Sequence, residues 1–514
     1  YFTDNRLVVT TLAKDPMPAA VQALPSLAAV APSPAASEKL DVPMVLQKTV
    51  LPQTNFKLLF AVGSANDPAG KEGLAALSAA MVAEAGSKEM RIDEITRALY
   101  PMAGSFTDQV DKEMTTFTGS IHRDNWRAFL DVVLPQLLEP GLREDDFQRL
   151  KDAQLNALKE DLRSNNEEEL GKERLQTNLF AATPYGHPVV GTVAGIQSIT
   201  LDDVRKFIAS AYSRANLTLG VAGDVPDEML ARVKQDVSKL PAGTAWPPAR
   251  VAARAPSGME VEIVEKETRA TAISFGHPIE VTRAHPDFAA LNVARAWLGE
   301  HRSSVSHLYN RIRETRGMNY GDYAYIEAFP RGMFQFFPDP NIARRAQIFE
   351  VWVRPVVPEN AQMALRIAVH ELDKLVRDGM SKEDFERTRD YLMKNVYVMT
   401  ATQNQQLGYA LDSRWYGIGE FTGTMRDRLA KLTVDDVNRA IRKHLSARNL
   451  SVVIVTKDAK GLRDKLVADA FSPIRYEGEK PADLLAEDKV IGALKLAIPA
   501  EKVKITPVEE VFAK

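Results

Sequence analysis

An internal duplication restricts the possible folds of this chain more than any other feature of its sequence. Residues 139–155, EPGLREDDFQRLKDAQL, resemble residues 377–393, RDGMSKEDFERTRDYLM. A second pair follows in the same order, because residues 200–221, TLDDVRKFIASAYSRANLTLGV, resemble residues 433–454, TVDDVNRAIRKHLSARNLSVVI. Two matched blocks at nearly the same separation indicate two homologous domains, and their period is far longer than that of a solenoid repeat.

Each half of the chain has the same order of strand-like and helix-like segments. Strand-like stretches open the halves (NFKLLFAVG in the first, MEVEIVE and TAISFGH in the second), and a long charged helix follows in each. The Thr of TLDDV and of TVDDV, with Asp three residues later, is typical of a capping box that opens a helix. Each half closes with a strand, NLTLGVAG or NLSVVIVT. We therefore predict an α+β fold of two homologous α/β-sandwich domains, each with a mixed sheet that packs helices on one face.

Breaks in composition suggest where the domains begin and end. The first residues are rich in Ala and Pro and lack periodicity, which is typical of a linker or surface strap. Four prolines interrupt the stretch LPAGTAWPPARVAARAPSG and mark an interdomain linker. The predicted organisation is an N-terminal extension (1–44), a first domain (45–239), a linker (240–257), a second domain (258–475) and a C-terminal tail (476–514).

Composition excludes several classes of protein. A chain of 514 residues that is 45% hydrophobic can bury more than one core. The net charge of −3 gives nucleic-acid binding no support. The chain has no cysteine, which excludes disulfides, zinc–thiolate sites and thiol catalysis. No run approaches the roughly 20 apolar residues of a membrane helix, so we expect no membrane span.

The same features bear on location. The absence of cysteine, the start at Tyr1 rather than Met and the Ala/Pro-rich leader favour a protein of the bacterial periplasm whose leader has been removed or trimmed. A mitochondrial matrix protein would tolerate these features too.

The stretch GLAALSAAM, residues 73–81, predicts a helix with an unusual face. Ala76, Ala79 and Ala80 stand at i, i+3 and i+4, so they lie together on one side of the helix. This spacing can bring three side chains to one ion and its water, yet all three positions carry a methyl group. Alone, such a triplet is typical of an ordinary good helix former.

The sequence resembles the inverzincin metallopeptidases of the pitrilysin and insulinase type over nearly the whole chain after about residue 45. The resemblance depends on the duplication and on GSANDPAGKEGLA, TPYGHPVVGTVAGIQSIT and LYNRIRETRGMNYGDY. The family signature, H-x-x-E-H after a Gly-Leu-Ala opening, binds zinc through two His and uses the Glu as general base. On this pattern Ala76 and Ala80 replace the His residues and Ala79 replaces the Glu, which implies a degenerate metal site. Glu160 lies near the family's third ligand position, but one carboxylate cannot hold zinc alone.

We predict no other metal site and no cofactor in this chain. His370 and Glu371 begin an H-E-x-x-H pattern, but Lys374 occupies its second His position. His301 and His307 do not have the spacing of one helix face. The remaining histidines are scattered, and we expect them to be surface or structural residues: His122, His187, His277, His285 and His444.

A second constellation of the family is intact. Within LYNRIRETRGMNY, Arg313 and Tyr320 resemble the Arg/Tyr pair that family members carry in the domain that faces the zinc site. The resemblance implies that the guanidinium and the phenol O–H reach the scissile peptide and favour the negative charge on its carbonyl oxygen. A structural alternative pairs Arg313 with Glu314 or a nearby helix and buries Tyr320 in the core. Arg311 and Arg316 are alternative candidates for the Arg role.

The resemblance implies half of an active site. We expect a non-catalytic subunit of a heterodimeric zinc metallopeptidase, with a homologous H-x-x-E-H partner that supplies the zinc, the attacking water and the general base. The two chains would form the halves of a clam-shell chamber that degrades peptides. The alternative is a binding or scaffold protein of the same fold without peptidase work, which subunits of mitochondrial respiratory complexes resemble. A peptidase active by itself would need ligands that this sequence lacks.

Overall fold

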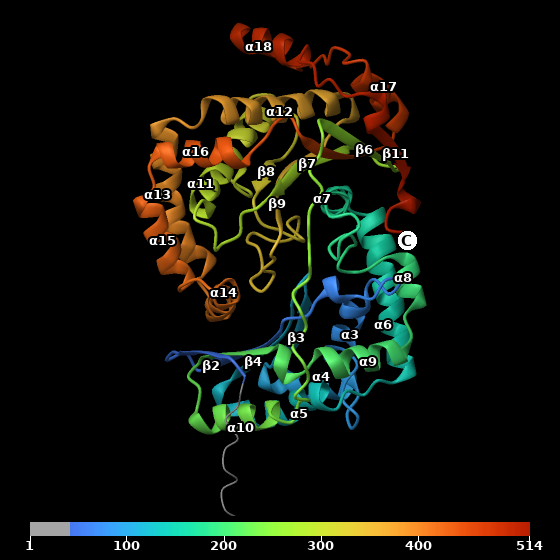
Figure 1. Ribbon diagram of the computed structural model, residues 1–514, viewed down its shortest axis with the longest axis vertical. Helices are drawn as coiled ribbons and strands as arrows, with labels where there is room; N and C mark the ends of the chain where they lie inside the picture. Colours follow the sequence, from blue (N-terminus) through green and yellow to red (C-terminus); the bar gives the residue numbers. More distant parts are fainter. Residues whose placement is uncertain (1–41) are drawn as a thin grey trace, which may run out of the picture. The chain divides into compact units, whose positions relative to one another are not determined.

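The computed structural model describes residues 42–514, and residues 44–223 contribute its first sheet (Figure 1). Five strands form this sheet in the order β1-β5-β2-β4-β3. β1 pairs with β5 in parallel, whereas the other neighbours are antiparallel, so the sheet is mixed as predicted. The strands are β1 (Met44–Lys48), β2 (Gln53–Phe60), β3 (Ser105–Val110), β4 (Thr115–His122) and β5 (Leu217–Gly223).

The second sheet repeats the order of the first and adds one strand. Its order is β11-β6-β10-β7-β9-β8, in which β6, β10, β7, β9 and β8 correspond to β1, β5, β2, β4 and β3. The two domains are therefore homologous in topology as well as in sequence. The strands are β6 (Met259–Glu265), β7 (Thr271–Ile279), β8 (Asp322–Tyr325), β9 (Gln347–Val356), β10 (Leu450–Thr456) and β11 (Val503–Pro507).

The last residues contribute to the second sheet. β11 pairs in parallel with β6, and helix α18 (Ala482–Gly492) precedes it. Both elements lie within the segment 476–514 that the sequence groups as a tail, so part of that segment is integral to the sheet. The four predicted boundaries between the five segments themselves stay predictions.

The predicted capping boxes are present in both halves. Thr200 caps α9 and Thr433 caps α16, and each hydroxyl accepts the N–H of the Asp three residues later at 3.2 Å. These helices lead directly towards β5 and β10, which are the closing strands of the two repeats.

Helices cover the sheets. Around the first sheet are α3 (Leu74–Ala83), α4 (Ile92–Leu99), α5 (Trp126–Leu138), α6 (Glu144–Asn156), α8 (Val193–Ser198), α9 (Leu201–Ala211) and α10 (Asp227–Val237). Around the second are α11 (Phe288–Gly299), α12 (Ala361–Asp378), α13 (Lys382–Met399), α15 (Phe421–Lys431), α16 (Val434–His444) and α17 (Ala459–Val467). The described residues contain no helix that is long and apolar enough to cross a membrane.

The two halves exchange one helix each, which the sequence did not predict. α7 (Glu167–Leu179), from the first half, packs on β7, β9 and β10 of the second sheet, and α14 (Gln403–Tyr416), from the second half, packs on β1, β2 and β5 of the first (Figure 1). Leu179 and Val455 share one buried cluster, and Leu411 and Leu59 share another. Each sheet is thus covered on both faces rather than on one.

Strand composition explains why both faces are covered. All seven residues of β10 and seven of the eight residues of β2 are buried, so neither strand has a polar face that could meet water. Gly220 in β5 permits the close approach of α14, because a Cβ atom there would lie 2.9 Å from Leu411 Cδ1. The exchanged helices therefore complete two cores that neither half closes by itself.

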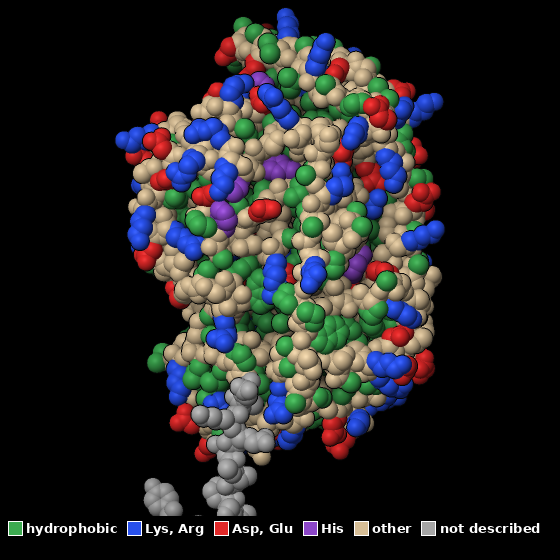
Figure 2. Space-filling view, viewed as in Figure 1, with side chains coloured by type: hydrophobic (Ala, Val, Ile, Leu, Met, Phe, Trp, Pro, Cys, Tyr) green, Lys and Arg blue, Asp and Glu red, His purple; other side chains and the backbone are tan. Residues whose placement is uncertain are grey.

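Charged side chains are distributed without a dominant sign. On the face shown in Figure 2, Lys and Arg are interspersed with Asp and Glu, and neither sign forms a continuous patch. This agrees with the formal net charge of −3.

Candidate functional site

The N-terminus of helix α3, which carries the three alanines, is fixed by hydrogen bonds to Asp67. Both carboxylate oxygens of Asp67 accept backbone N–H groups, from Gly73 and from Ala75, each at 2.7 Å. Gly73 has a φ of 106°, which glycine adopts without strain, and a Cβ there would lie 2.8 Å from the carbonyl oxygen of Val190. Burial raises the pKa of Asp67 to about 7, although the two N–H donors oppose the rise.

A buried lysine supplies positive charge beside this helix start. The Lys112 ammonium donates to the carbonyl oxygen of His187. Burial lowers the pKa of Lys112 to about 8, while the carboxylates of Glu173, Asp111 and Asp67 raise it. The protein therefore provides its own cation among the carboxylates of this region.

The face of α3 predicted to be degenerate contains methyl groups only. Ala79 is completely buried, and Ala76 and Ala80 are half-buried. A methyl group has no lone pair to offer a metal, so these three side chains cannot bind an ion. Glu160 lies in the π-helical segment η5 (Ala157–Ser164) and is exposed.

The structure brings the predicted Arg/Tyr pair together. Arg313 lies in the π-helical turn η7 (Tyr309–Glu314), and its guanidinium carbon is 5.3 Å from the centre of the Tyr320 ring. Tyr320 is 76% exposed, so it does not pack in the core. Across residues 42–514, Arg313 forms no ion pair, and its buried Nε atom has no hydrogen-bond partner. Arg313 and Tyr320 are therefore in contact, and Arg313 is not held by an ion pair within the described residues. The catalytic role of the two residues stays a prediction.

The other two arginines of this segment are committed to structural ion pairs. Arg311 Nε donates to Glu371 Oε1 at 2.7 Å. Arg316, whose side chain is fully buried, donates to Asp488 at 2.8 Å and to Glu487 at 2.9 Å. These acceptors lie on α12 and α18, so both helices hold the segment in place and neither arginine is free to meet a substrate.

Glu371 is the centre of a buried charge network rather than part of a metal motif. It accepts hydrogen bonds from Arg311 and from His307 Nε2, the latter at 2.7 Å. Lys374, at the failed second His position, lies 3.5 Å from the same carboxylate. Burial alone would raise the pKa of Glu371, but His307 and Arg311 lower it to about 2.

His301 and His307 are structural residues. Both ring nitrogens of His301 are hydrogen bonded, Nδ1 to the Tyr325 hydroxyl at 2.7 Å and Nε2 to the Gln335 carbonyl oxygen at 2.8 Å. Burial lowers the pKa of His301 to about 4. The ring of His307 stacks on Trp297 with centres 4.2 Å apart. Both nitrogens of His301 are therefore occupied, and His307 is held through Nε2 by Glu371.

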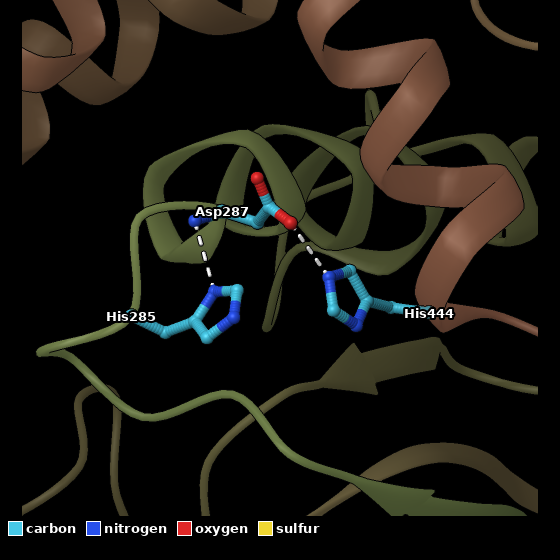
Figure 3. A group of neighbouring side chains, drawn as sticks. All are labelled: His285, Asp287 and His444. Carbon is cyan, nitrogen blue, oxygen red and sulfur yellow. Dashed lines mark hydrogen bonds and ion pairs between the residues drawn. The ribbon is translucent and has the colours of Figure 1, made fainter.

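Two histidines that sequence spacing treated as unrelated lie together with an aspartate. His285, Asp287 and His444 each offer one ligand atom, and these atoms lie within 4.8 Å of one another (Figure 3). Asp287 accepts from His444 Nε2 at 2.7 Å, and the Asp287 N–H donates to His285 Nδ1 at 3.0 Å. Among the described residues, this is the one group of three His, Asp or Glu side chains close enough to share an ion. No spacing rule could have found it, because His444 lies far from the other two in the sequence.

A long connection joins the second half of the chain to the edge strand of the first sheet. Between β8 and β9, the carbonyl oxygens of Pro340 and Asn341 accept from the Gln109 side chain of β3, at 2.9 and 3.1 Å. Arg344 then donates to both oxygens of Asp111, at 2.7 and 2.6 Å, and both side chains are buried. This bidentate pair fixes the turn that follows β3.

Comparison with known families supports the resemblance. Residues 44–193 match the model described as insulinase (peptidase family M16), and residues 198–392 match the model described as peptidase M16 inactive domain. Together the two matches span more than half of the chain.

The curated relatives have low sequence identity to this chain, but the matches extend over most of each relative's length. A protein named non-peptidase homolog YmxG, from Helicobacter pylori, is 22% identical over 82% of this chain and 93% of its own. A protein named uncharacterized zinc protease SCO5738, from Streptomyces coelicolor, is 23% identical over 74% of this chain and 80% of its own.

Solved structures share the fold. A crystal structure of a peptidase M16 inactive domain from Pseudomonas fluorescens has a TM-score of 0.71 at 20% identity, and covers 81% of this chain and 96% of its own. A protease structure from Helicobacter pylori has a TM-score of 0.66 at 17% identity, and covers 80% and 96% of the two chains. The predicted fold class is confirmed by these likenesses and by the two mixed sheets.

Proposed function

Because the chain belongs to the peptidase M16 family and lacks its H-x-x-E-H motif, we propose that it is the non-catalytic subunit of a heterodimeric zinc peptidase. A homologous chain with H-x-x-E-H supplies the zinc, the attacking water and the general base. This chain binds part of an extended peptide and contributes Arg313 and Tyr320 to the partner's site.

The uncommitted state of Arg313 carries the proposal. Arg311 and Arg316 show that this segment has carboxylates available for ion pairs, yet Arg313 uses none of them. Its Nε is buried without a partner, and among residues 42–514 no hydrogen bond or ion pair engages the rest of the guanidinium, which can therefore donate to a ligand. A peptide carbonyl oxygen is a suitable acceptor, and it becomes a better one as water attacks the carbonyl carbon and negative charge develops.

Tyr320 complements the arginine. Its hydroxyl is a second donor, and its exposed ring lies against the guanidinium of Arg313. The face of an aromatic ring attracts a cation, so the contact holds the guanidinium while leaving its N–H groups for substrate. Two donors of fixed geometry can bind one carbonyl oxygen in the ground state and more strongly in the transition state.

The relatives are consistent with a role beside a peptidase. One relative is named a non-peptidase homolog, and another is named a zinc protease. A family with both kinds of member makes a pairing of one active and one inactive chain a reasonable expectation for this protein.

The proposal is tested by mixing. The chain is purified and combined with an M16 chain that carries H-x-x-E-H and comes from the same genome, and hydrolysis of fluorogenic oligopeptides is measured. We expect no hydrolysis by this chain alone and hydrolysis that saturates at one chain per partner chain. A partner that reaches full activity alone contradicts the proposal.

A scaffold role gives a different result. In that case the two chains bind each other, but substitutions at Arg313 and Tyr320 leave hydrolysis unchanged. Arg426 and Tyr397 provide a matched control, because the guanidinium carbon of Arg426 lies 4.9 Å from the ring centre of Tyr397, and Arg426 Nε is also buried without a partner. Substitutions in this second pair test whether the position of the Arg/Tyr contact matters, rather than its chemistry alone.

A further inference from the structure

The group of His285, Asp287 and His444 is held by two packed helices (Figure 3). Asp287 is the N-cap residue of α11, and His444 is the last residue of α16, which packs against α11. His285 lies in a tight turn, where its N–H donates to Thr282 O at 2.8 Å and its carbonyl accepts from Phe288 N–H at 3.1 Å. The backbone positions of all three residues are therefore fixed by the second domain.

We propose that these three side chains bind one Zn²⁺ ion. Two imidazoles and one carboxylate are a common ligand set for zinc, and three protein ligands leave the fourth tetrahedral position to water. Bonds of about 2.0–2.1 Å place tetrahedral ligands roughly 3.4 Å apart. The ligand atoms lie within 4.8 Å of one another, so side-chain rotations must bring them roughly 1.4 Å closer to reach this separation.

Zinc would replace two groups that now contact the Asp287 carboxylate. The first is the Nε2–H group of His444, whose hydrogen must move to the other ring nitrogen before Nε2 can bind the ion. The second is the ammonium of Lys443, 3.0 Å from the same carboxylate oxygen and 57% exposed, which can turn into solvent. The carboxylate therefore already carries the negative charge that the ion requires.

His285 needs one rearrangement. Its Nδ1 accepts the Asp287 N–H, so a neutral ring carries its hydrogen on Nε2. The ring must rotate and give up that hydrogen bond to offer a lone pair to the ion, which is a small cost beside three metal–ligand bonds.

The site is structural and does not depend on the proposed function. Its ligands come from the second domain, whereas the degenerate face of Ala76, Ala79 and Ala80 belongs to α3 in the first. Zinc at His285, Asp287 and His444 would fasten the turn before α11 to the end of α16. The proposal replaces the expectation of no metal for the second domain, and for α3 that expectation stays a prediction.

The test uses the full chain, stripped with a chelator and titrated with Zn²⁺ by calorimetry. We expect one ion per chain and a higher melting temperature with zinc. His285→Ala and His444→Ala should each weaken zinc binding at least tenfold. Asp287→Asn, which keeps a good N-cap residue for α11, should do the same without loss of fold.

A matched control separates the site from incidental histidines. His122→Ala removes an exposed imidazole that lies 3.5 Å from the Asp124 carboxylate, and it should leave the zinc isotherm unchanged. Wild-type protein that takes up no zinc overturns the proposal. So does zinc that the folded His285→Ala and His444→Ala variants retain with wild-type affinity.

Discussion

The guanidinium carbon of Arg313 lies 5.3 Å from the centre of the exposed Tyr320 ring, although six residues, which include Gly317, separate the two in sequence. Two neighbouring arginines of the same segment are bound to carboxylates of α12 and α18. The segment is thus anchored by residues on both sides of Arg313, while Tyr320 is exposed and Arg313 has no ion pair among residues 42–514. This division between anchoring and uncommitted residues gives the first two predictions.

The first prediction concerns the pair in the mixed complex. Tyr320→Phe removes one O–H donor but keeps the ring, and we expect kcat of the complex to fall by about 10²–10³. Arg313→Lys keeps the charge but loses the planar fork, and activity should also fall well below wild type. KM should change less than kcat if the contacts form mainly in the transition state. Steady-state kinetics measure both, with complex formation checked separately.

The control for this prediction is the second Arg/Tyr pair. Tyr397→Phe and Arg426→Lys make the same chemical changes in a contact of similar geometry. These variants should keep wild-type kcat and KM. If Tyr320→Phe and Arg313→Lys assemble and turn over like wild type too, the Arg/Tyr pair has no catalytic role and the scaffold alternative gains support.

The second prediction concerns the anchor. Glu371→Gln removes the carboxylate that pairs with Arg311 and His307 inside the protein, and its side chain is completely buried. Loss of one member of a buried ion pair leaves an uncompensated charge, so we expect a loss of about 3–5 kcal/mol in the free energy of unfolding. Urea denaturation measures it. Glu314→Gln, an exposed change in the adjacent segment, should stay within about 0.5 kcal/mol of wild type.

The sequence predicted those parts of the fold that local patterns encode. The capping motifs at Thr200 and Thr433 predicted the start of the two helices that they cap. The repeated blocks predicted two domains of one topology, which the matching strand orders confirm. The Gly-Leu-Ala opening located α3, and the segment around Arg313 located the Arg/Tyr pair. In each case the information lies within a few neighbouring residues.

Features that depend on tertiary contact could not be predicted in this way. Nothing in the sequence of α7 shows which sheet it covers, because its buried charges find partners only in the fold, as Glu168 does with Arg354 at 3.0 Å. The meeting of His285 with His444 likewise requires α11 to pack on α16. The ion pairs of Arg311 and Arg316 could not be predicted either, because their carboxylate partners lie on α12 and α18.

The third prediction tests the exchanged helices. Leu411→Ala truncates a buried side chain of α14 that packs on the first sheet with Leu59 and Ala222. We expect a loss of about 2–5 kcal/mol from burial and cavity terms. Because α14 belongs to the second half but completes the core of the first, both halves should unfold in one transition at lower urea. Two separated transitions, reported by Trp126 and Trp352 in single-Trp variants, would contradict the coupling.

The last prediction concerns pH and Asp67. Burial raises its pKa in the folded protein from 3.8 to about 7, despite the N–H groups of Gly73 and Ala75. Between these two values the folded state binds more protons than the unfolded state, so stability should fall as pH rises from about 4 to about 7 and then level off. The slope from this one group is at most about 1.4 kcal/mol per pH unit.

Asp67→Asn cannot titrate, so the free energy of unfolding of wild type minus that of Asp67→Asn should decrease over this range. Asp131→Asn, an exposed control, should follow wild type at every pH. A difference between wild type and Asp67→Asn that stays constant from pH 4 to pH 8 would show that Asp67 is ionised throughout and that its two N–H bonds outweigh its burial.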